Sequence, residues 1–294
     1  MTPADQLYYT VHNHPTLDHP VLVVALEGWI DAGLGAASAV AALLAQSNDE
    51  TVVTFDSDHF IDQRARRPLA RIVDGITTKL TWPQIQIKLG RDRRGAQVLY
   101  LVGPEPDFHW RAFIDAVVSL AVANEVRMVV GLGAFPGPAP HTRPVRLAAT
   151  APPRSSDLVN QVGIVQGELE FPAGIMAALE MEFAAASIDV VTLWARVPHY
   201  VAAFPFPEAS AALVDGLAAV SGLALDSSEL RRAADTSRSQ IDAAVAANPE
   251  HVAMVRKLEE AIDASEGNPL GIEEVPSGDE IAAELERFLR GEGH

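Results

Sequence analysis

Short runs of consecutive apolar residues recur along this chain, and longer stretches typical of helices follow them. The run at residues 21–26 is entirely apolar, which is typical of a strand buried on both faces. Residues 33–46 then have the small side chains and the length of a buried helix. The same alternation returns later, with strands predicted at residues 51–55, 97–102, 127–132 and 189–195 and helices at 107–124 and 172–187. Alternation of this kind predicts a mostly parallel sheet covered by helices.

Four further strand-like segments fit antiparallel positions. They lie at residues 7–11, 71–74, 84–89 and 145–150. A sheet that includes them is mixed rather than purely parallel. We therefore predict an α/β fold with a mixed, mostly parallel sheet.

Glycine and proline cluster where the predicted strands end. Three such segments, at residues 103–106, 131–140 and 204–207, follow a strand and are predicted to be loops. Ligands of open α/β sheets bind at the carboxyl ends of the strands. Side chains in these loops are therefore candidates for a functional site.

The charge pattern changes after Leu225. Residues 226–294 hold 16 acidic and 7 basic residues, and helical spacing of their apolar residues predicts helices at 226–246, 249–264 and 278–290. The intervening segment 265–277 is rich in Gly, Pro and Glu, as is typical of a mobile loop. We expect a core domain at residues 1–225 and an acidic helical region at residues 226–294.

Composition removes several classes of protein. The absence of cysteine excludes disulfides, thiolate nucleophiles and cysteine-ligated metals, and a net charge of −17 disfavours binding to a phosphate backbone. The first 11 residues lack the basic and apolar regions of a secretory signal. The longest uncharged apolar run has 14 residues, whereas a membrane span needs about 20. We expect a cytoplasmic protein that binds neither nucleic acid nor membrane.

The loop at residues 27–35 imitates a dinucleotide-binding fingerprint, because it joins a strand to a helix and contains glycines. However, it lacks the third glycine of the fingerprint and carries Glu27 and Asp31 where a pyrophosphate needs positive potential. We favour a tight turn, in which glycines such as Gly33 let the helix pack closely on the sheet. Trp29 in this loop is typical of a residue that contacts a partner or lines a pocket.

An acidic cluster follows the next predicted strand. Residues 56–62 contain three aspartates, Asp58 among them, and one histidine. Carboxylates of this kind bind Mg²⁺, but no metal-ligand spacing is present. We favour an acidic loop in solvent that pairs with neighbouring arginines such as Arg67.

No established hydrolase or nucleotide motif occurs in the chain, including the Gly-x-Ser-x-Gly and His-Glu-x-x-His patterns. Glu105, His109 and Arg143 remain as polar candidates in the rim loops, and none is assigned a catalytic role. Asp107 is predicted to be the N-cap of the helix that begins there.

An ordered set of motifs resembles the proteasome assembly chaperone 2-like (PAC2) family. The set comprises residues 27–33, 58–68, 82–83, 103–106 with Trp110, 131–136, 143–144, 197–200 and 205–210. The acidic helical tail resembles the actinobacterial branch of this family. The resemblance implies a three-layer α/β/α fold similar to nucleoside phosphorylases and related hydrolases, helices added at the C-terminus, and homo-oligomers. Chaperone members of the family bind proteasome α-type subunits, and the family brings no settled catalytic residues.

Two hypotheses follow. The first is a non-enzymatic, oligomeric protein-binding module, related to proteasome assembly chaperones, with proteasome subunits or another protein as partner. The alternative is a protein that binds a small nucleoside- or phosphate-like molecule, or a hydrolase- or phosphorylase-type enzyme, that uses the rim loops. We expect no cofactor and no metal. The candidate ligand- or partner-binding residues are Glu27, Trp29, Asp31, Gly33, Asp58, Arg67, Glu105, His109 and Arg143.

Overall fold

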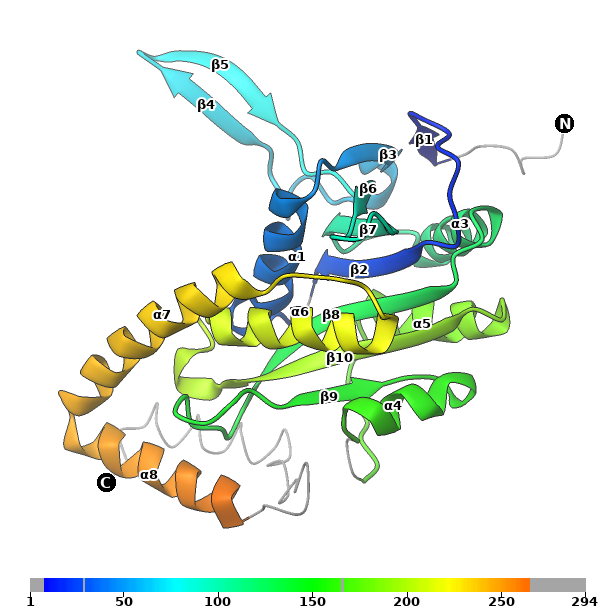
Figure 1. The fold of residues 1–294 in the computed structure, drawn as a ribbon. Helices are drawn as coiled ribbons and strands as arrows, with labels where there is room; N and C mark the ends of the chain where they lie inside the picture. The colour runs from blue at the N-terminus through cyan, green and yellow to red at the C-terminus, as the bar shows by residue number, and fades with distance from the viewer. Residues whose placement is uncertain (1–7, 29, 165–166, 265–294) are drawn as a thin grey trace, which may run out of the picture.

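A mixed sheet forms the centre of the fold in the computed structural model, which describes residues 8–28, 30–164 and 167–264 (Figure 1). Within these residues eight strands pair in the order β1-β3-β6-β7-β2-β8-β10-β9. The four strands β7, β2, β8 and β10 are parallel neighbours, and the outer pairings are antiparallel. Their bounds are β1 Tyr9–Val11, β2 Val21–Glu27, β3 Glu50–Phe55, β6 Gln86–Arg91, β7 Gln97–Pro104, β8 Met128–Gly137, β9 Leu147–Thr150 and β10 Asp189–Pro198.

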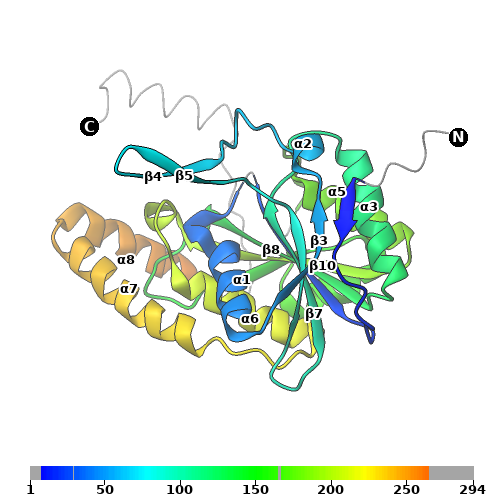
Figure 2. The same cartoon turned by 90° about the horizontal axis from the view of Figure 1, so that it is seen from above.

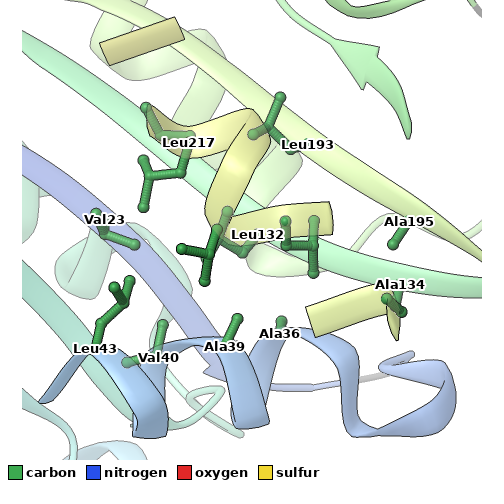
Figure 3. Close-up of a cluster of buried hydrophobic side chains, with 14 of the residues drawn as sticks. Val23, Ala36, Ala39, Val40, Leu43, Leu132, Ala134, Leu193, Ala195 and Leu217 are labelled. Carbon is green, nitrogen blue, oxygen red and sulfur yellow. The ribbon is translucent and has the colours of Figure 1, made fainter. Parts of the chain in front are cut away.

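Helices cover both faces of this sheet, as Figure 2 shows. The longer covering helices are α1 (Gly35–Gln46) and α6 (Pro207–Ser221) on one face and α3 (Trp110–Ala123) and α5 (Ile175–Ala185) on the other. Figure 3 shows the first of the two resulting cores, where Leu43 of α1 and Leu217 of α6 meet Val23, Leu132 and Leu193 of the strands. The predicted three-layer α/β/α fold is confirmed. Shorter helical segments are α2 (Ser57–Phe60), α4 (Ser156–Val162), η2 (Ala32–Leu34), η3 (Pro153–Ser155) and η4 (His199–Val201).

Two helices follow this three-layer body, α7 (Ser228–Ala246) and α8 (Pro249–Ala264). They match the first two helices predicted in the acidic region, and Figure 1 shows them extending along one side of the body. The predicted loop at 265–277 and the predicted helix at 278–290 lie outside the described residues.

The prediction of a loop over residues 131–140 was wrong for residues 131–137, because β8 continues to Gly137 and pairs with β10. The glycines are explained by the neighbouring strand. A Cβ at Gly133 would lie 2.4 Å from the Trp194 ring, and one at Gly131 would lie 2.6 Å from Thr192 Oγ1. Glycine at these positions makes room for the Trp194 and Thr192 side chains of β10.

The segment predicted at residues 71–74 is a strand of a separate hairpin and not of the main sheet. Among the residues that the structure describes, β4 (Leu69–Val73) pairs only with β5 (Ile76–Thr81). The sequence analysis did not predict β5. Asp74 and Gly75 join the strands with φ of 48° and 82°, as a two-residue hairpin turn requires. Every residue of both strands is exposed, and Figure 1 shows the hairpin projecting away from the body.

Candidate functional site

The rim loops lie at one edge of the sheet, where the parallel strands β7, β2, β8 and β10 end. Glu105 follows β7, and its backbone N–H donates to the carbonyl of Glu27 at the end of β2, 2.8 Å away. The Glu105 carboxylate accepts a hydrogen bond from the backbone N–H of Ile175 at 2.5 Å. Because Ile175 is the first residue of α5, Glu105 satisfies a free N–H at that helix terminus.

The Glu105 carboxylate lies close to the backbone of Gly28. A Cβ at Gly28 would lie 2.7 Å from its Oε2 atom, so the glycine makes room for the carboxylate. Glu27 itself is exposed. The two glutamates are therefore adjacent through their backbones, and the Glu105 side chain joins the strand ends to α5.

Asp31 has the same kind of role at α1. Its two carboxylate oxygens accept hydrogen bonds from the backbone N–H groups of Ala36 and Ala37, at 2.8 and 3.0 Å. Burial raises the pKa of this carboxyl although those bonds oppose the change. The N–H groups that a pyrophosphate would need at this helix terminus are thus already bonded to Asp31.

Gly33 adopts a φ of 64° between Asp31 and α1. Its N–H donates to the Ala202 carbonyl at 2.8 Å, and its own carbonyl accepts from Phe206 N–H at 2.9 Å. A Cβ here would lie 2.8 Å from Phe206 Cβ. Gly33 therefore lies against the loop that precedes α6. Trp29, the remaining candidate in this loop, lies outside the described residues.

His109 and Asp58 lie near a stack of rings beside α2. The His59 ring stacks on Tyr8 and on His109, with centroids 3.8 and 4.1 Å apart. Burial, and then the neighbouring His109, lowers the pKa of His59, and Asp56 opposes the change. Asp58 and Arg67 are exposed. Within the described residues no group of three or more histidine, aspartate or glutamate side chains has a geometry suited to a metal ion.

The prediction that Asp107 is the N-cap of a helix was wrong, because α3 begins at Trp110 and its N-cap residue is His109. The Asp107 carboxylate instead accepts hydrogen bonds from the Asp62 backbone N–H at 2.8 Å and from Arg66 Nε at 3.3 Å. It therefore joins the loop after α2 to the rim.

Arg143 bonds to the C-terminal helix α8. Its guanidinium group pairs with Asp263 at 2.7 Å and with Glu259 at 3.2 Å. Next to it, buried His141 bonds to the Tyr200 hydroxyl at 2.6 Å and to Asp242 of α7 at 2.9 Å. Arg143 therefore holds α8 against the loop after β8.

Sequence reasoning missed a buried polar cluster between α5 and the sheet. Glu180 accepts hydrogen bonds from the hydroxyls of Thr192 and Thr150, the latter at 3.0 Å. Trp194 Nε1 donates to Thr150 at 3.1 Å. Burial raises the pKa of the Glu180 carboxyl. A glutamate in the middle of a helical pattern gives no local signal of burial, because the strands that cover it are distant in the chain.

We expect Glu180→Gln to stabilise the protein at neutral pH by on the order of 1 kcal/mol. Because burial raises the folded-state pKa above 4.5, stability from this group is fully present below that pH and is lost as the pH rises through the folded-state pKa. Glutamine keeps the acceptor oxygen and does not ionise. Urea unfolding over a series of pH values measures the difference. Glu182→Gln, at an exposed position of the same helix, is the control. A pH dependence that Glu180→Gln leaves unchanged would contradict the prediction.

Comparison with known proteins identifies the family. A family model described as the PAC2 family matches residues 25–245. The chain belongs to the PAC2 family. The resemblance inferred from the ordered motifs is therefore confirmed. A comparison with curated proteins gives no match for this PAC2 chain.

Solved structures share the PAC2 fold over most of their length. A Mycobacterium tuberculosis protein of unknown function is 34% identical, with a TM-score of 0.83 over 89% of this chain and 93% of that one. A Mycobacterium tuberculosis proteasome-assembly chaperone homologue is also 34% identical, with a TM-score of 0.74 over 80% of this chain and 99% of that one. An archaeal proteasome activator from Pyrococcus furiosus is 15% identical, with a TM-score of 0.61 over 80% of this chain and 97% of that one, and this likeness concerns the fold alone. In the described part of this PAC2 chain, none of the helices is both long and apolar enough to span a bilayer.

Proposed function

We propose that this PAC2 protein is a non-enzymatic, oligomeric protein-binding module of the cytoplasm that acts as an assembly chaperone for proteasome subunits. The observation that carries the proposal is the β4–β5 hairpin. Exposed apolar side chains cluster on it, with Leu69 75% exposed, Ile76 68% and Ile72 63%. Apolar residues gathered in this way on a projecting element are typical of a contact surface for another protein.

The hairpin also offers main-chain groups to a partner. Within the described residues its two strands pair only with each other, so each keeps one edge of free N–H and C=O groups. A sheet edge of this kind binds extended segments of other proteins by adding a strand. The side chains and the backbone of the hairpin therefore favour the same kind of partner.

The charge of the hairpin region specifies the chemistry of that partner. Residues 64–81 contain five basic residues and one acidic residue, Asp74, in a chain of net charge −17. One of the five, Arg66, pairs with Asp107. A basic surface on an acidic protein attracts an acidic partner and increases the rate of association. We infer that the partner surface is apolar and acidic.

The family supports proteasome subunits as that partner. One relative at 34% identity is described as a proteasome-assembly chaperone homologue. The rim gives little support for catalysis, because the Glu105 and Asp31 carboxylates already bond to backbone N–H groups at helix termini. One observation, a pocket lined by arginines, favours a small-ligand site as a second candidate function.

The experiment mixes the full chain with separately expressed α-type and β-type proteasome subunits from the same source, and follows complex mass by size-exclusion light scattering. We expect a stable complex with one subunit type. The double variant Leu69→Asp/Ile76→Asp should weaken it by at least about tenfold in Kd, because apolar anchors contribute most of the binding energy of an interface.

The matched control is Val122→Asp/Val252→Asp, which adds the same charge at exposed apolar positions of α3 and α8. It should bind as the unmodified protein does. Equal loss of binding in both double variants would show that charge alone, and not the hairpin, matters. Absence of any complex with the unmodified chain would overturn the proposed function.

A further inference from the structure

A narrow pocket opens beside the carboxyl end of β10, where the loop after β8 meets α8. Its volume is about 20 Å³, which is room for about one water-sized group. Arg143, Arg146 and Arg196 line it together with apolar residues that include Pro140, Phe206 and Ile262.

The three arginines differ in their partners. Arg143 is paired with Glu259 and Asp263. Arg196, in contrast, has a buried Nε atom with no hydrogen-bond partner. Burial, and then the like charge of Arg146, lowers the pKa of Arg196. A buried polar atom without a partner destabilises the folded state, so the Arg196 Nε–H is suited to an acceptor that the described residues do not provide.

The backbone holds Arg146 and Arg196 next to each other. The N–H of Arg196 donates to the carbonyl of Arg146 at 3.2 Å. A Cβ at Gly137 would lie 2.8 Å from Arg196 Cγ, so the aliphatic stem of Arg196 crosses the β8 backbone where glycine leaves room. The position of the Arg196 side chain therefore depends on the fold and not on a bound partner.

We propose that Arg146 and Arg196 bind an oxyanion, the phosphate or carboxylate group of a small ligand. Guanidinium groups bind such oxygens through two parallel N–H donors, and these charge-assisted hydrogen bonds are among the strongest. The pocket admits about one oxygen, so the rest of the ligand lies outside it. The site goes beyond the proposed protein-binding function, because it lies in the body of the fold and includes no residue of the hairpin.

The test follows the thermal unfolding midpoint of the full chain during a titration with inorganic phosphate, and a parallel titration with acetate, at ionic strength held constant with sodium chloride. We expect phosphate to raise the midpoint and to broaden its own ³¹P resonance. The Arg196→Gln variant should weaken the apparent affinity by at least about tenfold, the equivalent of one lost charge-assisted contact. Arg196→Lys keeps the positive charge but lacks the planar guanidinium group. Its apparent affinity for phosphate should lie between those of the unmodified protein and Arg196→Gln.

The midpoint without phosphate reports whether each variant folds, and Arg196→Gln should fold because it removes a half-buried charge whose Nε atom has no hydrogen-bond partner. Arg154→Gln, which removes an arginine from the exposed ion pair with Asp189, should leave the phosphate response unchanged. An apparent phosphate affinity that Arg196→Gln weakens by at least about tenfold supports the site, and an equal response to acetate extends it to carboxylates. A response no larger than that to sodium chloride, or an equal loss in Arg154→Gln, overturns it. None of these outcomes depends on the binding of a proteasome subunit, so the two proposals fail separately.

Discussion

Replacing Phe113 by alanine is expected to lower the free energy of unfolding by about 3–5 kcal/mol, the range for truncating a fully buried phenylalanine. Phe113 is a residue of α3 and its side chain is completely buried. Its ring centroid lies 4.9 Å from that of Phe55 and 5.4 Å from that of Phe60, in tilted and edge-on arrangements that add to the stabilisation from burial. Alanine would leave a cavity between α3 and the sheet that these rings cannot fill.

Urea denaturation measures the effect as a lower midpoint with an unchanged dependence on urea concentration. Phe108→Ala is the control, because this nearby ring is 47% exposed and its removal should change stability by about 1 kcal/mol or less. Since domains are stable by only about 5–15 kcal/mol, the Phe113 variant should lose a large fraction of its stability. Equal effects of the two substitutions would mean that the aromatic cluster is not packed as described.

The second large effect is expected from Gly103→Ala at the end of β7. Gly103 has a φ of 115°, where an L residue is strained by about 1–3 kcal/mol. A Cβ would also lie 2.1 Å from the carbonyl oxygen of Gln84 and 2.9 Å from Ile85 Cα. Both atoms belong to backbone, so relief requires the strand ends to move apart. We expect Gly103→Ala to lower the free energy of unfolding by about 3 kcal/mol or more. We also expect it to displace Glu105 from α5.

Gly95→Ala separates the two contributions, because Gly95 has a φ of 88° and nothing within 4 Å of an added Cβ. Gly95→Ala should lower the free energy of unfolding by about 1–2 kcal/mol, because only the backbone conformation is strained. Thermal and urea unfolding of both variants give the comparison. If the two losses are the same, the clash of an added Cβ with Gln84 contributes nothing to the destabilisation by Gly103→Ala.

Local patterns predicted the main elements wherever one residue class continued without interruption. The apolar run at 21–26 corresponds to β2 (Val21–Glu27), and the small-residue stretch at 33–46 contains α1. Strand β5 was missed because an exposed hairpin has no buried face, so its residues do not show the alternation that a core imposes. The end of β8 was missed because its glycines are typical of a loop, and their reason, the Trp194 ring, lies on another strand.

The candidate site, too, was predicted from the sequence only in part. Glycine- and proline-rich strand ends predicted the rim, and Glu105 and Asp31 do lie there. That the Glu105 carboxylate bonds to Ile175 depends on α5, which begins 70 residues later in the chain. Arg146 and Arg196 carry no local motif at all. They become neighbours only because β9 pairs antiparallel with β10.

The amino-acid sequence by itself determined the fold class, most of the strands and helices, the acidic character of the last region and, through its ordered motifs, the PAC2 family. These follow from periodicity, composition and short motifs, which are properties of neighbouring residues. The tertiary structure alone decided the exposure of the β4–β5 hairpin, the pairing of Arg143 with α8 and the unpartnered Nε of Arg196. Each of these depends on which distant segments pack together, because burial and the supply of hydrogen-bond partners are set by those contacts.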